Sequence, residues 1–442
     1  MSTRFALVAR QIAFNLRGGF LVRPLAVTLV LGAAGALFSQ LEETFPAAGS
    51  WVPSLIFPSH ADPTVGQAIL GVIATSIMTV VSIVFAILLM TLTLASMQFS
   101  PRIIVSFARD RVTQWTLGLF LGTFSYCIAA LPAARSMPRP FMPAATVLGA
   151  MALALCCVGM LLFFIHHISQ AISVSHIVDR IASETVVIID ETMPKPRGLP
   201  VHTGARAFDL GPQAAVLPSP TSGYLRFIDQ KRLVQLAKAY RIKVQVLRRV
   251  GQFIPEGTPL AKVDRADRIT LERRLELARA FDLGPSRTLQ QDLEFGILQI
   301  VDIALKAISP AVNDPTTAIN CVDQLSRILI RYVAKEPPET VLYAPPGLGR
   351  VALPSLRFGK VLASAFDQIR HYSKADLAVS LRLMRAVGDI GVTTKDPEIL
   401  CELAALADRI TRGCEAHLTE EDLSPLRERM AQVGSCHASG RA

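Results

Sequence analysis

The feature that most constrains this chain is the stretch from Pro63 to Pro101, which contains no Asp, Glu, Lys, Arg or His. A helix needs about 20 residues, at about 1.5 Å rise per residue, to cross the apolar core of a bilayer. The stretch exceeds that length and is too apolar for the surface of a soluble domain. We therefore predict a membrane-spanning helix that begins with Asp62 as its cap and Pro63 in the first helical position.

Three further apolar runs lie on either side of this stretch. Charged residues make up only 18% of the 442 residues, against roughly 25% in a soluble domain, and the deficit falls before about residue 165. We expect residues 1–167 to form a transmembrane domain and the rest to be soluble. The predicted spans lie at about residues 25–41, 65–100, 113–134 and 141–165.

The arginines outside these spans predict the orientation. The segment before the first span has four arginines, and the loop after the second span has Arg102, Arg109 and Arg111. The loops on the other side have only Arg135 and Arg139. Because positive residues remain in the cytoplasm, we expect both termini and the soluble part to be cytoplasmic. Arg102, Arg109 and Arg111 could also contact an anion or lipid head groups.

One face of the second span is rich in hydroxyl groups, and we call it the hydroxyl seam. Its members recur at alternating spacings of four and three residues, which places them on one helix stripe. They are Thr75, Thr79, Ser82, Ala86, Leu89, Thr93, Ser96 and Ser100.

Two interpretations of the hydroxyl seam are open. Small residues let membrane helices pack closely, and Ser and Thr hydroxyls bond across the interface or back to the carbonyl four residues earlier. Alternatively, the seam lines a water-filled pathway in a homo-oligomer, and the three arginines of the following loop surround its exit. Spans two to four contain no charged residue or histidine, which argues against a proton relay or a charged coupling site. The predicted pore-lining residues are Thr75, Thr79, Ser82, Thr93, Ser96 and Ser100.

The soluble part divides by composition and periodicity into four segments. We expect a helical extension and linker at 168–200, a small β domain at 201–266, a helical domain at 267–431 and a disordered tail at 432–442. In the β domain, GQFIPEGTPLAKV (251–263) predicts strand, tight turn, strand. It resembles the hairpin of lipoyl- or biotinyl-carrier barrels, although its turn lacks the carrier lysine. The expected fold is thus an α-helical polytopic membrane protein with a cytoplasmic α+β part: a small lipoyl-like β barrel, then a helical bundle.

The phrase SPAVNDPTTAINCVDQL predicts a helix start at Asp314, with Pro315 in the first helical position. Free backbone N–H groups at such a terminus can hold an anion. Asn313, Asp314, Thr316 and Thr317 are therefore the ligand-binding candidates. The alternative is that Asn313 and Asp314 only cap the helix.

Other site chemistry is not indicated. The seven cysteines show no CxxC spacing, and the adjacent His166 and His167 point about 100° apart on a helix, so we expect no metal and no cofactor. No nucleophile elbow, Walker loop, GxGxxG turn or HExxH motif is present, and we do not expect an enzyme. The net charge is +10, but no basic run has interleaved aromatics, so we expect no nucleic-acid partner.

Three phrases carry a resemblance to a known family: QFSPRIIVSFARD, GQFIPEGTPLAKV and EFGILQIVDIALKAISPAVNDPTTAINCVDQL. Over about residues 10 to 420, the chain resembles the bacterial predicted membrane proteins grouped as domain of unknown function 2254. The phrase from Ser309 to Pro315 is the most distinctive. The resemblance implies a multi-pass protein of the bacterial inner (plasma) membrane and supplies no catalytic residue.

Two functions follow as hypotheses. The first is a homo-oligomeric ion channel or passive transport protein with a cytoplasmic gating or ligand-binding domain. Its partners would be the lipid bilayer, other copies of the chain, and an inorganic ion or small anion. The second is a membrane-anchored regulatory or scaffold protein whose soluble domain binds a small anion, a nucleotide or a protein partner.

Overall fold

The computed structural model describes residues 22–45, 62–98, 111–135, 140–171, 173–193, 208–211, 214–337, 340–345 and 347–439. The chain divides into two compact units, Met1–Ser173 and Val174–Ala442. Each unit has hydrophobic clusters of its own.

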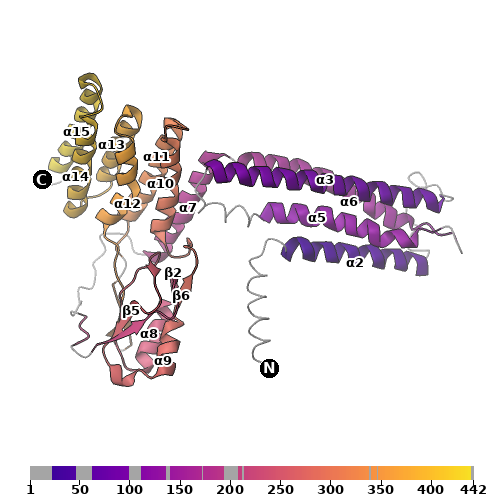
Figure 1. The fold of residues 1–442 in the computed structure, drawn as a ribbon, viewed down its shortest axis with the longest axis horizontal. Coiled ribbons are helices and arrows are strands. Elements are labelled where there is room, and N and C mark those ends of the chain that lie inside the picture. Colours follow the sequence, from indigo (N-terminus) through magenta and orange to yellow (C-terminus); the bar gives the residue numbers. More distant parts are fainter. Residues whose placement is uncertain are drawn as a thin grey trace. The chain divides into compact units, whose positions relative to one another are not determined.

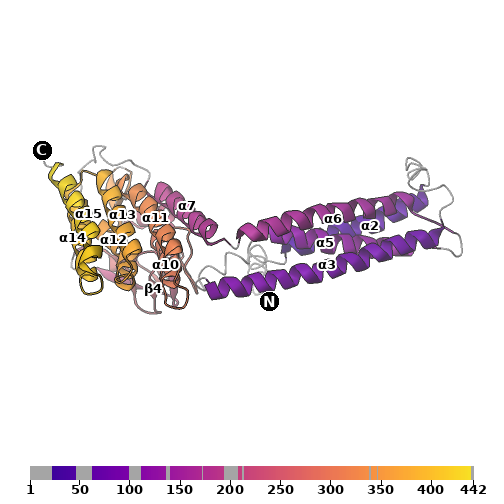
Figure 2. The same cartoon turned by 90° about the horizontal axis from the view of Figure 1, so that it is seen from above.

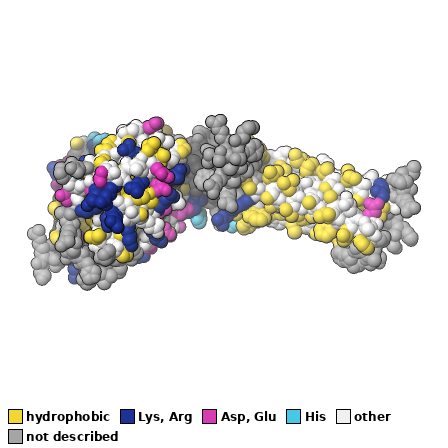
Figure 3. Space-filling model, turned by 90° about the horizontal axis from the view of Figure 1, so that it is seen from below, with side chains coloured by type: hydrophobic (Ala, Val, Ile, Leu, Met, Phe, Trp, Pro, Cys, Tyr) yellow, Lys and Arg dark blue, Asp and Glu magenta, His cyan; other side chains and the backbone are white. Residues whose placement is uncertain are grey.

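The described part of the first unit contains four long helices that lie side by side (Figures 1 and 2). They are α2 (Val22–Thr44), α3 (Pro63–Gln98), α5 (Arg111–Ala130) and α6 (Ala144–Ala171), with a 3-10 turn, η2 (Leu131–Ala133), after α5. By length and composition, each contains a segment that could cross a membrane. Hydrophobic side chains cover much of the face of this unit that Figure 3 draws. The four predicted apolar spans are thus confirmed as helices of the required length and apolarity.

Glycines let α2 and α5 approach closely. A Cβ at Gly35 would lie 2.5 Å from the carbonyl oxygen of Tyr126, and one at Gly32 would lie 2.3 Å from the Ser125 hydroxyl. On the other side of the contact, a Cβ at Gly122 would lie 2.5 Å from Leu31. Small residues at such contacts are typical of membrane helices, because they bring two backbones into van der Waals range.

The helix after span four is interrupted. The expected helical extension at 168–200 is not continuous with span four, because α6 ends at Ala171 and α7 (Val174–Thr192) begins a new helix. Helix α7 packs in the second unit, with Ile177, Ile181 and Ile188 buried. Ion pairs from α11 (Pro315–Val333) to α7 support this contact: Arg327 to Asp179 at 2.8 Å and Arg331 to Asp190 at 2.7 Å.

Helices α7 and α10–α15 form the helical part of the second unit (Figures 1 and 2). The remaining members are α10 (Leu293–Ala307), α12 (Phe358–Tyr372), α13 (Leu377–Val392), α14 (Pro397–Cys414) and α15 (Glu420–Ser439). Each buries one apolar face, as the amphipathic pattern of residues 267–431 indicated. Helix α15 runs to Ser439, although we expected disorder from residue 432.

The strands form two open sheets, and among the described residues neither closes into a barrel. The larger sheet has the order β1-β5-β3-β8-β7, with only the β3–β8 pair parallel. The smaller has the order β4-β2-β6 and is antiparallel. In chain order the strands are β1 (Ala215–Pro218), β2 (Gly223–Ile228), β3 (Val244–Val246), β4 (Phe253–Ile254), β5 (Pro259–Val263), β6 (Phe281–Gly284), β7 (Val341–Ala344) and β8 (Leu348–Ala352).

The lipoyl-like barrel is therefore not supported. The expected hairpin at 251–263 does contain two strands and a tight turn, and Gly257 in that turn has φ +77°. The two strands do not pair, however, because β4 joins the smaller sheet and β5 the larger one. Strands β6, β7 and β8 arise where we predicted only helices. The predicted domain boundaries themselves stay predictions.

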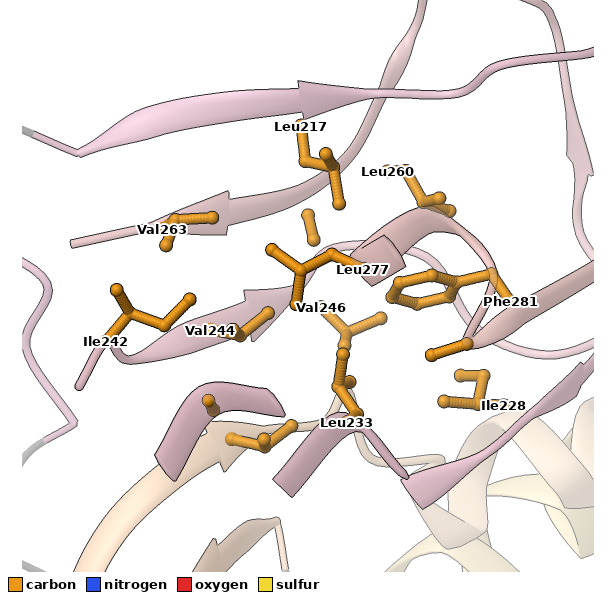
Figure 4. Close-up of a cluster of buried hydrophobic side chains, with 14 of the residues drawn as sticks. Leu217, Ile228, Leu233, Ile242, Val244, Val246, Leu260, Val263, Leu277 and Phe281 are labelled. Atoms are coloured by element: carbon orange, nitrogen blue, oxygen red, sulfur yellow. The ribbon is translucent and has the colours of Figure 1, made fainter. Parts of the chain in front are cut away.

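One hydrophobic core joins the two sheets (Figure 4). It receives Leu217 and Leu260 from the larger sheet, Ile228 from the smaller one, Leu233 from α8 (Gln230–Ala239) and Leu277 from α9 (Leu271–Ala278). Each of these side chains is buried. The core fixes the short strands, whose own hydrogen bonds are too few to hold them.

Candidate functional site

The start of α3 matches the sequence prediction. The Asp62 carboxylate accepts a hydrogen bond from the backbone N–H of Thr64 at 3.0 Å, and Pro63 is the first helical residue. The hydrogen bonds from Thr64 hold the pKa of Asp62 below its usual value. This cap satisfies one of the N–H groups that every helix leaves free at its first turn.

The hydroxyl seam faces away from the other described helices of its unit. Its described members, Thr75 to Thr93, are all exposed in the single chain. The face that contacts α5 and α6 instead contains Leu70, Ile77 and Val84, which are buried. Packing between the described helices of this unit therefore does not account for the described hydroxyls. The side chain of Ser96 and the whole of Ser100 lie outside the described residues.

Each described hydroxyl of the seam bonds to its own helix. Thr75 donates to the Gly71 carbonyl at 2.9 Å and Thr79 to the Thr75 carbonyl at 3.0 Å. Ser82 and Thr93 donate in the same way to the carbonyls four residues earlier, at 3.1 and 2.8 Å. The hydroxyl oxygens retain lone pairs that can accept a further hydrogen bond. The seam can thus accept hydrogen bonds from water. It can also face lipid, because each described hydroxyl already donates its proton to a backbone carbonyl.

The structure describes one of the three arginines of the loop after the second span. Arg102 and Arg109 lie outside the described residues. Arg111 is the first residue of α5 and is exposed. Its predicted contact with an anion or a lipid head group stays a prediction.

The N-terminus of α11 forms the predicted cap. The Asp314 carboxylate accepts from the backbone N–H of Thr317 at 3.0 Å and from its hydroxyl at 2.6 Å. These bonds, with one from the Thr316 backbone, lower the pKa of Asp314. Asn313 adopts the left-handed conformation, with φ +50°. The geometry accounts for Asp314 and Thr317 as capping residues, and ligand binding by the four candidates stays a prediction.

A cavity of about 320 Å³ lies in the second unit. Its lining comes from the ends of α7, β2 and α11, the starts of α8, α10 and β7, and the segments after β3 and β8. This volume is within the range of small-molecule pockets, about 300–1,000 Å³. Sequence reasoning missed the cavity because its residues are scattered between positions 192 and 356.

The cavity has mixed chemistry. Its charged groups include Arg249 and Glu294, whose side-chain nitrogen and oxygen lie 4.0 Å apart. The second carboxylate oxygen of Glu294 accepts from the Ser364 hydroxyl at 2.9 Å. The Tyr332 hydroxyl donates to the Leu356 carbonyl at 2.7 Å. Apolar side chains such as Leu353 complete the wall, so a small molecule with both an apolar body and polar groups would match the lining.

A metal centre is not indicated in the described part of the chain. No group of three or more His, Cys, Asp or Glu side chains lies close enough there to hold an ion. His166 instead contacts the Gln170 side chain at 3.1 Å, and His167 stacks on Phe163.

The four apolar helices and the α+β unit define a polytopic membrane protein with a large non-membrane part. The chain belongs to the family of predicted membrane proteins called domain of unknown function 2254 (DUF2254), whose family model matches residues 17–389.

The similar proteins include two uncharacterized mycobacterial ones, Rv1290c of Mycobacterium tuberculosis and Mb1321c of Mycobacterium bovis. Each is 29% identical to this chain over 425 residues, which covers 93% of this chain and 79% of the relative. No solved structure matches the chain. The family assignment predicted from the three sequence phrases is confirmed.

Proposed function

We propose that this chain is a homo-oligomeric channel or passive transport protein of the bacterial inner membrane. In this proposal several copies turn the hydroxyl seam of α3 toward a common axis. The second unit, in the cytoplasm, gates the pathway or binds a ligand. The observation that carries the proposal is the exposure of Thr75, Thr79, Ser82 and Thr93 on one stripe of an apolar helix.

The energetics of the seam favour contact with water or another copy over contact with lipid. A hydroxyl bonded to its own helix can stay in hydrocarbon, but its spare acceptor sites are then unused. Four such residues lie on one exposed stripe of α3, next to exposed apolar residues such as Ile83 and Phe85. Association along this stripe would remove it from hydrocarbon.

A passive pathway also agrees with the charge pattern. Spans two to four contain no ionisable side chain of the kind that usually marks proton-coupled or ion-coupled transport. The seven arginines on one side and two on the other support a cytoplasmic location for both termini.

Recording from planar bilayers tests the proposal. Purified full-length protein should give discrete conductance, and Thr79→Leu and Ser82→Leu should reduce it by narrowing and drying the pathway. Ile83→Leu and Phe85→Leu are matched controls on exposed apolar positions of the same helix and should conduct normally. Absence of conductance, or equal conductance in both pairs of variants, would contradict the proposal.

The cavity favours a second candidate function, that of a membrane-anchored regulatory protein that binds a small molecule. Thermal-shift measurements of the full chain in detergent against a metabolite panel would test it. A stabilising ligand should lose its effect in Arg249→Met, which removes the charge at the cavity wall. Arg232→Met is the matched control, because Arg232 is exposed on α8 and does not line the cavity. A panel without any stabilising compound would count against this function.

A further inference from the structure

The second unit contains four arginines near the turn at Arg241 and Ile242. We call them the arginine cluster: Arg241, Arg268, Arg273 and Arg350. The guanidinium of Arg268 donates to the Arg241 carbonyl at 3.0 Å, and that of Arg273 donates to the Arg268 carbonyl at 2.8 Å. Arg350 donates to the Ile242 carbonyl at 3.4 Å. Within the part of the chain that the structure describes, none of the four forms an ion pair.

This arrangement differs from the helical part of the same unit, where arginines are paired with carboxylates. Arg327 pairs with Asp179, and Arg331 and Lys335 both pair with Asp190. In the described part of the second unit, carboxylates therefore neutralise these basic side chains of the helices. The arginine cluster has no carboxylate partner there.

The surroundings of the cluster are also basic. Residues 238–243 and 262–279 together with Arg350 contain ten Lys or Arg residues and four acidic ones. Two of the four acids are engaged locally, since Glu276 accepts from the Tyr240 hydroxyl and Asp264 accepts from the Lys243 backbone N–H. Figure 3 shows Lys and Arg side chains gathered on the face of the second unit that it draws, the side on which α8 and α9 lie in Figure 1.

Helix α9 adds apolar side chains to this basic surface. Leu277 anchors the helix in the core and is fully buried. Leu271 and Leu275, one helical turn apart, are 74% and 50% exposed. Arg274 lies between them in the sequence and is exposed as well. A short helix with outward leucines and surrounding arginines has the character of an interfacial membrane contact.

We propose that this surface, made by the arginine cluster, Arg265, Arg274, Leu271 and Leu275, docks onto the anionic head groups of the bilayer that the chain itself crosses. The arginines bind the phosphates and the two leucines enter the head-group boundary. The membrane helices tether the second unit to the bilayer, which raises the effective concentration of head groups at this surface. A nucleic acid would match the arginines but would gain nothing from exposed leucines.

Hydrogen exchange of the full chain in nanodiscs tests the proposal. One set of discs contains phosphatidylcholine alone, and the other contains phosphatidylcholine and phosphatidylglycerol in equal amounts. The amides of α9 should exchange more slowly in the anionic discs, and high salt should remove the difference. Each unit of charge removed from the surface should lower the ratio of docked to undocked protein about fivefold.

Exposed positions provide the variants. Arg265→Glu with Arg274→Glu should abolish the protection of α9, and Leu271→Ser with Leu275→Ser should reduce it. The control is Val392→Ser with Lys395→Glu, an exposed apolar residue and an exposed lysine elsewhere on the same unit, which should leave the protection intact. Equal exchange in neutral and anionic discs would overturn the proposal. So would protection by an added oligonucleotide and not by phosphatidylglycerol, or an equal loss of protection in the control.

Discussion

The buried carboxylate of Glu42 on α2 accepts hydrogen bonds from both the backbone N–H and the hydroxyl of Thr146 on α6, at 3.1 and 3.0 Å. It also accepts from the backbone N–H of Ala145 at 2.9 Å. The first turn of α6 is thus capped by a side chain from a different helix. A carboxylate near a helix N-terminus interacts favourably with the helix dipole. This contact holds α2 against the first turn of α6.

We expect Glu42→Ala to lower the free energy of unfolding by about 2 kcal/mol, because it removes charge-assisted hydrogen bonds and leaves buried donors unsatisfied. Glu42→Gln should recover part of the loss. Thermal unfolding of the detergent-purified chain measures the effect. Glu43→Gln is the control, since Glu43 is exposed and pairs with Arg135 at the surface, where such pairs contribute up to about 1 kcal/mol. Equal stability of Glu42→Ala and the wild type would refute the capping role.

Gly35 and Gly71 provide a matched pair for the packing of α2. Because a Cβ at Gly35 would lie 2.5 Å from the Tyr126 carbonyl oxygen, Gly35→Ala should cost about 1–3 kcal/mol through overpacking. At Gly71 of α3, a Cβ would meet nothing within 4 Å, and Gly71→Ala should be neutral or slightly stabilising. Unfolding in detergent compares the two. If Gly35→Ala and Gly71→Ala change the free energy of unfolding equally, the close approach of α2 and α5 at Gly35 is contradicted.

The Asp314 cap predicts a pH-dependent stability. Its folded pKa is lowered by the Thr317 hydroxyl and backbone N–H. A lowered pKa stabilises the fold fully above the unfolded value of about 3.9, and this contribution is lost as the pH falls through the folded pKa. Asp314→Ala should therefore cost about 1 kcal/mol at pH 7, and less in acid. Asp314→Asn, which keeps an acceptor, should lose less. A loss that is the same at every pH would show that the carboxylate charge is irrelevant.

The sequence predicted the parts of the fold that depend on local pattern. Long uncharged runs predicted the four apolar helices, and the Asp-Pro pairs at Asp62 and Asp314 predicted two helix starts, both of which the structure contains. The predicted pairing of strands was wrong, because strand pairing depends on contacts between residues that are distant in sequence. Strand β5 pairs with β1 and β3, not with β4, which is only four residues away.

Among the candidate sites, too, only the one that depends on local sequence pattern could be predicted. The periodicity of the hydroxyl seam could be read from the sequence, because the spacing of Thr75, Thr79 and Ser82 repeats the helical turn. The cavity and the arginine cluster could not, since each joins residues from distant segments. Arg241 and Arg350, for example, meet around Ile242 only because β3 and β8 pair in parallel.

Labelling of single cysteines in α3 tests the transport proposal most directly. Single cysteines are introduced into a chain without its native cysteines, at Thr75, Thr79, Ser82, Ile83 or Phe85. Each variant is reconstituted into liposomes and treated with a membrane-impermeant, water-soluble thiol reagent. A water-filled pathway along the hydroxyl seam predicts rapid labelling at Thr75, Thr79 and Ser82 and none at Ile83 or Phe85. If the three seam positions react only after the membrane is dissolved, the seam is dry and the pathway does not exist.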